Sequence, residues 1–209
     1  EVLSLLSGDE ELRQIIDELF FDDMIDYLEE MPANVVKKIL KNAPEAERKL
    51  INQFLKYPED SAGSLMTIEF VDLKKQMTVK DALEHVRYTG TNKETIYTCY
   101  VIDQFRRLEG IISLKDLVLA PANTIVGDIM DTNFISVHTH EDQEEIAETF
   151  KRYDLLSLPV VDMESRLVGI ITIDDVVDVI EQENTEDFQK MAALQPSEED
   201  YLDTGDFPL

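Results

Sequence analysis

The 209-residue chain carries 45 aspartates and glutamates against 19 lysines and arginines, which gives a formal charge of −26 at neutral pH. This charge repels nucleic acids and anionic lipid headgroups, so the expected small partners are cations and no nucleic acid is expected. The single cysteine, Cys99, excludes an internal disulfide and suits a reducing compartment. No window reaches the roughly 20 apolar residues that a membrane-spanning helix needs.

The first section, residues 1–57, repeats apolar pairs at the i, i+1, i+4 spacing of an amphipathic helix. Four such segments begin at Ile15-Ile16, Met24-Ile25, Val35-Val36 and Leu50-Ile51. Pro32 and Pro44 fall at first-turn positions, where a missing N–H costs nothing. Helices this short are unstable alone, so we expect them to stack as a small all-α superhelical domain.

One stretch further along the chain is written twice. Residues 97–118 align without a gap on residues 156–177, and the match includes Gly110 with Gly169 and Asp116 with Asp175. Upstream, the match continues from Met66 to Met130 at a slightly larger offset. The chain therefore contains a duplicated unit, and a repeat of this length constrains the fold more than any short motif.

Each copy predicts the same order of elements: an amphipathic helix, a strand, a turn, a second strand and a helix. Apolar residues place the amphipathic helices at Val79, Leu83, Val86 and at Ile146, Ala147, Phe150. Ser113 and Thr172 suit helix N-caps, with Asp116 and Asp175 in the first turn. A unit of about 60 residues is only marginally stable alone, so the two copies should pack together.

The duplicated unit resembles the CBS domain. The Gly-Ile-Ile-Ser/Thr endings and the strand Leu-Pro-Val-Val-Asp are typical of that family, and the resemblance covers residues 61–182. It implies an α/β (α+β) tandem pair with pseudo-symmetry, whose clefts often hold adenine nucleotides. By itself it indicates a regulatory module and leaves the regulated activity open.

Segments around and within this pair resemble, more narrowly, the cytosolic part of MgtE-type magnesium transporters. The matching segments are 57–67, 94–97, 142–147, 151–156, 174–181 and 185–191. The resemblance implies four parts, namely a helical N domain over 1–57, CBS domains over 58–122 and 123–183, and a connecting helix and tail over 184–209. We therefore expect a fragment of a membrane protein at the cytoplasmic face, a homodimer through its CBS domains, joined to a transmembrane pore that this chain lacks.

Carboxylates gather on the helix that leaves the second copy. Asp174, Asp178 and Glu181 share one face of it, and Asp22 and Asp26 form another i, i+4 pair. Like charges at this spacing destabilise a helix by roughly a few tenths of a kcal/mol. A hard divalent cation such as Mg²⁺ would offset that cost.

The resemblance assigns roles to single acidic residues. Asp22, Asp26 and Asp175 match positions where the N domain and the second CBS domain share magnesium. The remaining acidic positions lie where the CBS pair meets the connecting helix: Asp154, Glu183, Glu186 and Asp187. A helix cap is the alternative role for Asp22, and a first-turn carboxylate for Asp175.

Together these features predict a Mg²⁺-sensing and gating module that is not an enzyme. Without cation the carboxylates repel one another and the module opens, whereas bound Mg²⁺ bridges the domains and favours the closed pore. The alternative is a sensor of ATP or AMP. By resemblance, Ser113, Asp116 and Thr172 would contact ribose and phosphate, and Leu155 and Pro159 would wall the adenine. Catalysis has no support, since the chain has no P-loop, G-x-S-x-G or H-E-x-x-H.

Overall fold

The computed structural model describes residues 19–194, except for the side chains of Asn42, Gln182 and residues 186–194. The first predicted helix, at Ile15-Ile16, lies outside this range. The other three are present as α2 (Phe21–Glu29), α3 (Ala33–Asn42) and α4 (Glu45–Phe54). The prolines Pro32 and Pro44 are the N-caps of α3 and α4, one residue earlier than predicted.

The N domain packs on the second copy of the repeat. Phe21 and Phe54 join α2 to α4 through an edge-to-face ring contact of 4.6 Å between centroids. Both rings belong to a buried cluster that also contains Phe150 and Val176 of the second copy. Burying side chains of this size stabilises by about 1.5–3 kcal/mol each. The N domain and the second copy therefore share one hydrophobic core.

The first copy contains a three-stranded sheet with helices at its ends. Its elements are α5 (Ala62–Leu65), β1 (Val71–Leu73), α6 (Val79–Thr89), η2 (Gly90–Asn92), β2 (Thr98–Ile102), β3 (Leu108–Ser113) and α7 (Leu114–Leu119). Strand β1 is parallel to β2, which is antiparallel to β3. Helix α6 and the β2–β3 hairpin confirm the prediction from sequence, whereas β1 is too short to show a period.

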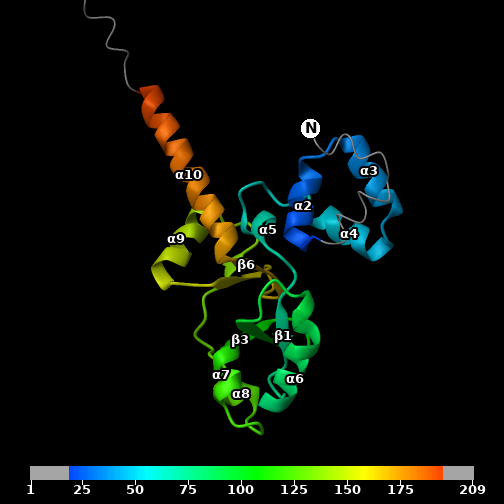
Figure 1. The fold of residues 1–209 in the computed structure, drawn as a ribbon, viewed down its shortest axis with the longest axis vertical. Coiled ribbons are helices and arrows are strands. Elements are labelled where there is room, and N and C mark those ends of the chain that lie inside the picture. The colour runs from blue at the N-terminus through cyan, green and yellow to red at the C-terminus, as the bar shows by residue number, and fades with distance from the viewer. Residues whose placement is uncertain (1–18, 195–209) are drawn as a thin grey trace, which may run out of the picture.

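The second copy repeats this plan and then extends it. Its elements are α8 (Val126–Ile129), β4 (Val137–His138), α9 (Gln143–Tyr153), β5 (Ser157–Val161), β6 (Leu167–Thr172) and α10 (Ile173–Leu194). Strands β4, β5 and β6 have the order and directions of β1, β2 and β3. The main difference is length, because α10 has 22 residues and α7 has six. Helix α10 leads away from the body of the molecule (Figure 1).

The segment that leads into each copy packs against the sheet of the other copy, so the two copies exchange these leading segments. Thr67, which leads into the first copy, forms a β-bridge with Ile170 of the second, and Asp131 of the second pairs with Ile111 of the first. A Cβ at Gly169 would lie 2.6 Å from the Met66 sulfur. At the equivalent Gly110 it would lie 2.8 Å from the sulfur of Met130. The matched glycines are therefore sites where the other copy's methionine enters.

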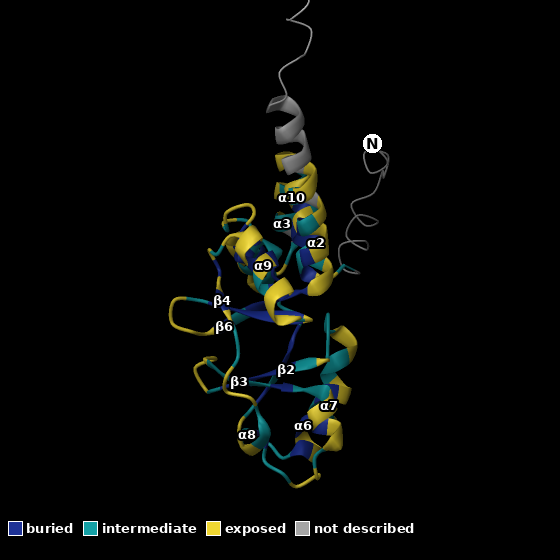
Figure 2. Ribbon diagram, turned by 90° about the vertical axis from the view of Figure 1, so that its left-hand side faces the viewer, coloured by how far each residue is buried: buried dark blue, intermediate teal, exposed yellow. Residues whose placement is uncertain are grey.

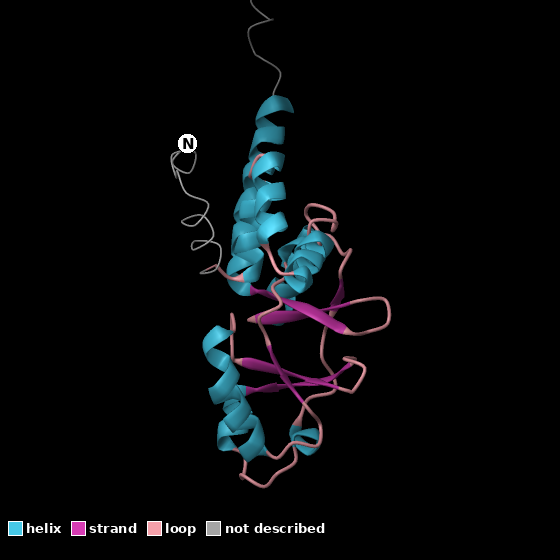
Figure 3. Cartoon of the chain, turned by 90° about the vertical axis from the view of Figure 1, so that its right-hand side faces the viewer, coloured by secondary structure: helices cyan, strands magenta, loops and turns pink. Residues whose placement is uncertain are grey.

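The two sheets lie next to each other, with helices towards the outside (Figure 3). Between them lies a small core of Phe70, Tyr100, Ile102, Leu167 and Ile170. The sheets are also joined by a hydrogen bond of 2.7 Å between the Tyr100 hydroxyl and the Ser157 hydroxyl. Strands of both sheets are largely buried, while the helices expose their outer faces (Figure 2). This two-unit α/β body after an α-helical domain confirms the predicted fold class.

Cys99 is a buried free thiol on β2, as its strand context predicts. Within the part of the chain that the structure describes, no helix is both long and apolar enough to cross a bilayer.

Candidate functional site

Acidic residues of the N domain and of the second copy line one cleft of about 370 Å³. We call it the carboxylate cleft, and its lining residues are Asp26, Glu29, Glu59, Asp60, Ser64, Leu65, Gln143, Asp175, Asp178 and Val179. Helix α2 supplies Asp26, and helix α10 supplies Asp175 and Asp178. Helix α2 and the first turns of α10 thus approach each other with their acidic faces.

The N terminus of α2 is capped from outside the N domain. Its N-cap residue, Phe20, makes no side-chain capping bond. Instead, the backbone N–H of Phe21 donates to Oε2 of Glu69 at 2.9 Å, and the Thr67 hydroxyl donates to the same oxygen at 2.9 Å. Asp22 lies in the first turn and is not the cap, which corrects the capping alternative. Glu69 thereby ties α2 to the linker into the first copy.

The first turn of α10 holds two carboxylates around one hydroxyl. Thr172, the last residue of β6, places its hydroxyl against Asp174 and against Oδ2 of Asp175, the latter at 2.8 Å. A hydroxyl has a single proton to donate. Only one of the two carboxylates can therefore receive it at a time.

Asp22, Asp26 and Asp175 lie where α2 faces the first turn of α10, which we call the seam, and each is harder to ionise than a free carboxyl. Burial, reinforced by the charge of Asp175, raises the pKa of Asp22 to about 7. Burial, followed by the charges of Glu29 and Asp175, raises the pKa of Asp26 to about 6. Burial also raises the pKa of Asp175, although the hydrogen bond from Thr172 opposes it. The seam therefore resists carrying its full negative charge.

Two carboxylate oxygens at this seam are buried without a hydrogen-bond partner. They are Oδ1 of Asp22 and Oε2 of Glu94. Burial, followed by the charges of Asp174 and Asp175, raises the pKa of Glu94. Among the described side chains, no lysine or arginine forms an ion pair with any of these carboxylates. A buried, unpaired carboxylate is costly, so these oxygens are suited to accept a cation.

The donor set consists of oxygens, which suits Mg²⁺ rather than a metal that prefers nitrogen or sulfur. Residues 19–194, as far as their side chains are described, contain no group of three or more His, Cys, Asp or Glu placed to hold a metal ion together. Mg²⁺ commonly takes one or two carboxylates and keeps several waters. The cleft therefore fits a hydrated ion and does not form a closed protein cage.

Four predicted metal residues with described side chains do not line the cleft, namely Asp22, Asp154, Asp174 and Glu183. Asp154 is exposed and ends α9 with a left-handed backbone (φ 51°), and it does not line the cleft. Glu183 lies on α10 and accepts a hydrogen bond of 2.8 Å from Nε2 of Gln143. Glu186 and Asp187 fall on α10, but their side chains lie outside the described residues.

The predicted nucleotide residues divide between the two copies. Ser113 caps α7 by accepting from the Asp116 backbone N–H at 3.0 Å, and its hydroxyl donates to the Asp116 carboxylate at 2.6 Å. In the second copy, the equivalent Thr172 contacts the acidic seam. Leu155 is half-buried against the core, and Pro159 is buried within β5.

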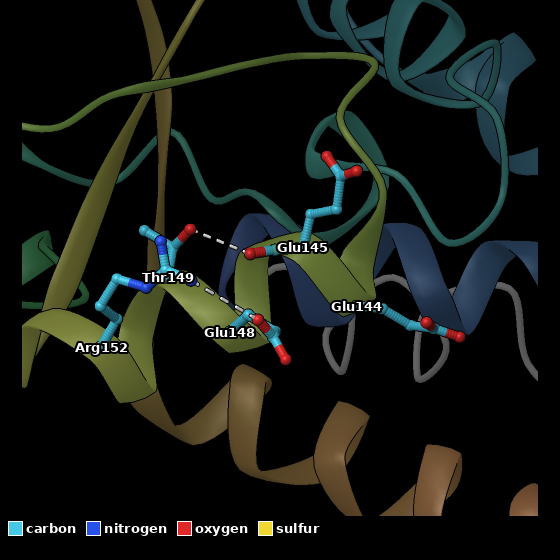
Figure 4. A pocket seen from close by; sticks show the side chains of 5 residues that line it. All are labelled: Glu144, Glu145, Glu148, Thr149 and Arg152. Atoms are coloured by element: carbon cyan, nitrogen blue, oxygen red, sulfur yellow. Dashed lines mark hydrogen bonds and ion pairs between the residues drawn. The ribbon is translucent and has the colours of Figure 1, made fainter.

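A second hollow of about 340 Å³ lies along α9 (Figure 4). Its described lining residues are Glu144, Glu145, Glu148, Thr149 and Arg152. The Thr149 hydroxyl donates to the Glu145 carbonyl at 2.9 Å, and Arg152 lies 3.9 Å from Glu148. These contacts run along one helix and do not converge on a point where a ligand would bind.

Sequence reasoning missed Glu29, Glu59, Asp60, Glu69 and Glu94 as site residues. Glu29 follows Asp26 at i+3, a helical spacing that could have added it to the predicted pair. Glu69 and Glu94 come from loops of the first copy, where no periodicity marks them. Their position beside α2 and α10 depends on tertiary contacts that the sequence does not display.

Family models match most of the chain. One described as the MgtE intracellular N domain matches residues 3–60, and the CBS domain model matches residues 62–123 and 126–182. The magnesium transporter MgtE of Thermus thermophilus is 42% identical over 194 residues, which cover 90% of this chain and 42% of that protein. The chain spans less than half the length of this relative.

Two solved structures share the fold at substantial identity. A crystal structure of the soluble part of a magnesium transporter is 38% identical with a TM-score of 0.78, covering 80% of this chain and 66% of that one. The cytosolic domain of the Mg²⁺ channel MgtE in complex with ATP is 41% identical with a TM-score of 0.78. That match covers 82% of this chain and 71% of the other.

Proposed function

Because the chain belongs to the MgtE family and comprises its N domain and CBS pair, we propose that it is the Mg²⁺-sensing and gating module of a magnesium transporter. The observation that carries this proposal is the seam between α2 and α10. There, Asp22 and Glu94 each bury a carboxylate oxygen without a partner. A cation bound there would balance these groups.

In this proposal, Asp22 and Asp26 hold Mg²⁺ from the N domain, and Asp174, Asp175 and Asp178 hold it from the second CBS domain. The ion supplies positive charge at a seam whose own groups are acidic. Carboxylates that repel one another without the ion then attract it jointly, which stabilises the docked position of the N domain.

The proposed output is the connecting helix. Helix α10 begins at the carboxylate cleft and continues away from the CBS pair, so its direction depends on what the cleft holds (Figure 1). Asp154, Glu183, Glu186 and Asp187 would bind further Mg²⁺ between the CBS pair and this helix. Docking of the N domain would favour the closed pore. Weak sites suit millimolar sensing, because a Kd of 1 mM corresponds to about −4 kcal/mol.

Small-angle scattering across a Mg²⁺ titration at fixed ionic strength tests the proposal. We expect the fragment to become more compact at about millimolar Mg²⁺, and Asp175→Asn to raise the midpoint. Glu84→Gln is the matched control, because it removes one exposed acidic charge from α6, remote from the cleft. Identical scattering with and without Mg²⁺ would refute a cation-gated module.

We also propose that the chain forms a homodimer through its CBS domains. Two equivalent apolar patches are exposed, one in each copy: Tyr97 with Val118, and Leu156 with Val177. Tyr97 and Leu156 are 67% and 61% exposed. Unpaired apolar side chains at matched positions support a face that a second copy covers.

Adenine-nucleotide sensing is the second candidate. It is supported by the similarity to an ATP-bound MgtE cytosolic domain and by the exposed Asp116 beside Ser113 at the start of α7. The equivalent Asp175 neighbours the N domain, so we expect ATP or AMP at the first copy's Asp116 and not at the second copy's Asp175. Calorimetric titration with ATP tests this, and Asp116→Ala should abolish the heat. Retained heat in that variant would move the site elsewhere.

A further inference from the structure

The segment that joins the N domain to the CBS pair is fixed to the loop before α9. The backbone N–H groups of Ala62 and Gly63 donate to the carbonyls of Glu141 and Thr139, both at 2.8 Å. In return, the backbone N–H of Gln143 donates to the Asp60 carbonyl at 2.9 Å. Asp60 has a left-handed backbone, with φ at 59°, at this turn. We call residues 60–63 the hinge, since they set the path of the chain between the two domains.

Gln143 also contacts helix α10. Its side chain is buried, with 5% of the residue exposed, and its Nε2 donates to Oε1 of Glu183 at 2.8 Å. One residue thus holds the hinge by its backbone and α10 by its side chain. Gln143 also lines the carboxylate cleft beside Asp175 and Asp178, so an ion there would lie close to this hydrogen bond.

The first copy provides an internal comparison. Thr78 and Asp142 are the N-caps of α6 and α9, so Val79 is the equivalent of Gln143. The backbone N–H of Val79 makes the equivalent bond, to the Thr124 carbonyl at 2.8 Å, and Val79 is 1% exposed. The fold therefore accepts an apolar side chain at this position. A side-chain amide occurs at this position only in the second copy, whose final helix, α10, extends as far as Glu183.

We propose that Gln143 is a positioning residue that couples the hinge to α10, so that docking of the N domain fixes the direction of the connecting helix. This coupling rests on the proposed function, because the event that it transmits is the docking of the N domain by Mg²⁺. The output passes through the Gln143–Glu183 bond, which joins two side chains outside helix α2. Binding and transmission are therefore separable in one experiment.

Spin-label distances in the 209-residue chain test the coupling. Labels at Lys49→Cys and Met163→Cys report N-domain docking, and labels at Met163→Cys and Asn184→Cys report the direction of α10. All three positions are exposed, whereas the native Cys99 is buried. Labelled chains are diluted into unlabelled chains so that distances between protomers do not contribute.

The variant Gln143→Val copies the residue of the first copy. We expect the α10 distance of this variant to respond to Mg²⁺ at a midpoint about tenfold above that of its own docking distance, or not at all, whereas the two midpoints coincide in the wild-type chain. The exchange Gln143→Glu with Glu183→Gln keeps an amide–carboxylate pair and should restore part of the α10 response. Circular dichroism checks that both variants fold.

The outcomes distinguish the two ideas. If neither distance in the wild-type chain responds to Mg²⁺, the proposed function fails. If the wild-type distances respond and Gln143→Val leaves the α10 titration unchanged, the coupling is refuted while the proposed function stands. If Gln143→Val does not fold, the single variant Gln143→Glu replaces it. The coupling is supported if Gln143→Glu loses the α10 response and the added Glu183→Gln restores it. The coupling is refuted if Gln143→Glu keeps the α10 response.

Discussion

Replacing Asp22 by asparagine should stabilise the fragment when Mg²⁺ is absent. The substitution keeps the shape of the side chain and removes the charge that the seam resists. Raising the pKa from 3.8 to about 7 corresponds to at most about 4 kcal/mol for keeping this carboxyl ionised. Asp22 is partly exposed, so solvent screening reduces the expected gain to about 1–2 kcal/mol.

The sign of the effect depends on pH. Because the folded-state pKa of Asp22 is raised, its ionisation lowers the stability of the fold progressively between about pH 4 and pH 7. We therefore expect the gain from Asp22→Asn to be full near pH 8 and to be less than half as large near pH 5, because it reaches zero only below the unfolded-state pKa of about 4, where both states are protonated. Saturating Mg²⁺ should reverse the order, because only the carboxylate binds the ion strongly.

Urea unfolding with chelator, and with about 10 mM Mg²⁺, at both pH values measures this directly. Glu84→Gln controls for the loss of one negative charge from the whole chain. The reasoning would be refuted if Asp22→Asn were destabilising near pH 8 in chelator, or if its gain were the same at both pH values.

Three further outcomes are expected. Mg²⁺ binding near pH 6.5 should release about one proton, because Asp22 and Asp26 are partly protonated there, and almost none near pH 8.5. Calorimetry in buffers of different ionisation enthalpy measures this release, and equal heats in all buffers near pH 6.5 would show that no proton is released. Val118→Glu should lower the dimer fraction in analytical ultracentrifugation, and an unchanged fraction would exclude this patch from the interface. Tyr100→Phe should cost about 1 kcal/mol in urea unfolding by leaving Ser157 unpaired, and a neutral result would assign that bond no net contribution.

Much of the fold follows from local patterns. The apolar spacing of Val79 and Val86, and of Ile146 and Phe150, predicted α6 and α9, and the duplication predicted two copies of one plan. The family models and relatives confirm the resemblance to the MgtE cytosolic region and the expectation of a non-catalytic module. Strands of two or three residues, such as β4, are too short for any period and depend on the neighbouring strand.

The candidate site could be predicted only in part. Spacing along single helices indicated Asp22 with Asp26 and Asp174 with Asp178, because each pair lies within one element. Glu69 and Glu94 depend on where the N domain sits, which sequence spacing does not encode.

The exchange of leading segments has a consequence for synthesis of the chain. The first copy's sheet contacts Met130 and Asp131, which are synthesised after that sheet. The second copy's sheet contacts Met66 and Thr67, which are synthesised long before it. Neither copy can form all of these contacts before both have been synthesised, so the pair should become resistant to protease in one step. Chains arrested at residue 122 should remain sensitive to protease, and protection of such chains would show that the first copy folds alone. The duplication in this sequence thus corresponds to one cooperative folding unit, although it is written as two copies.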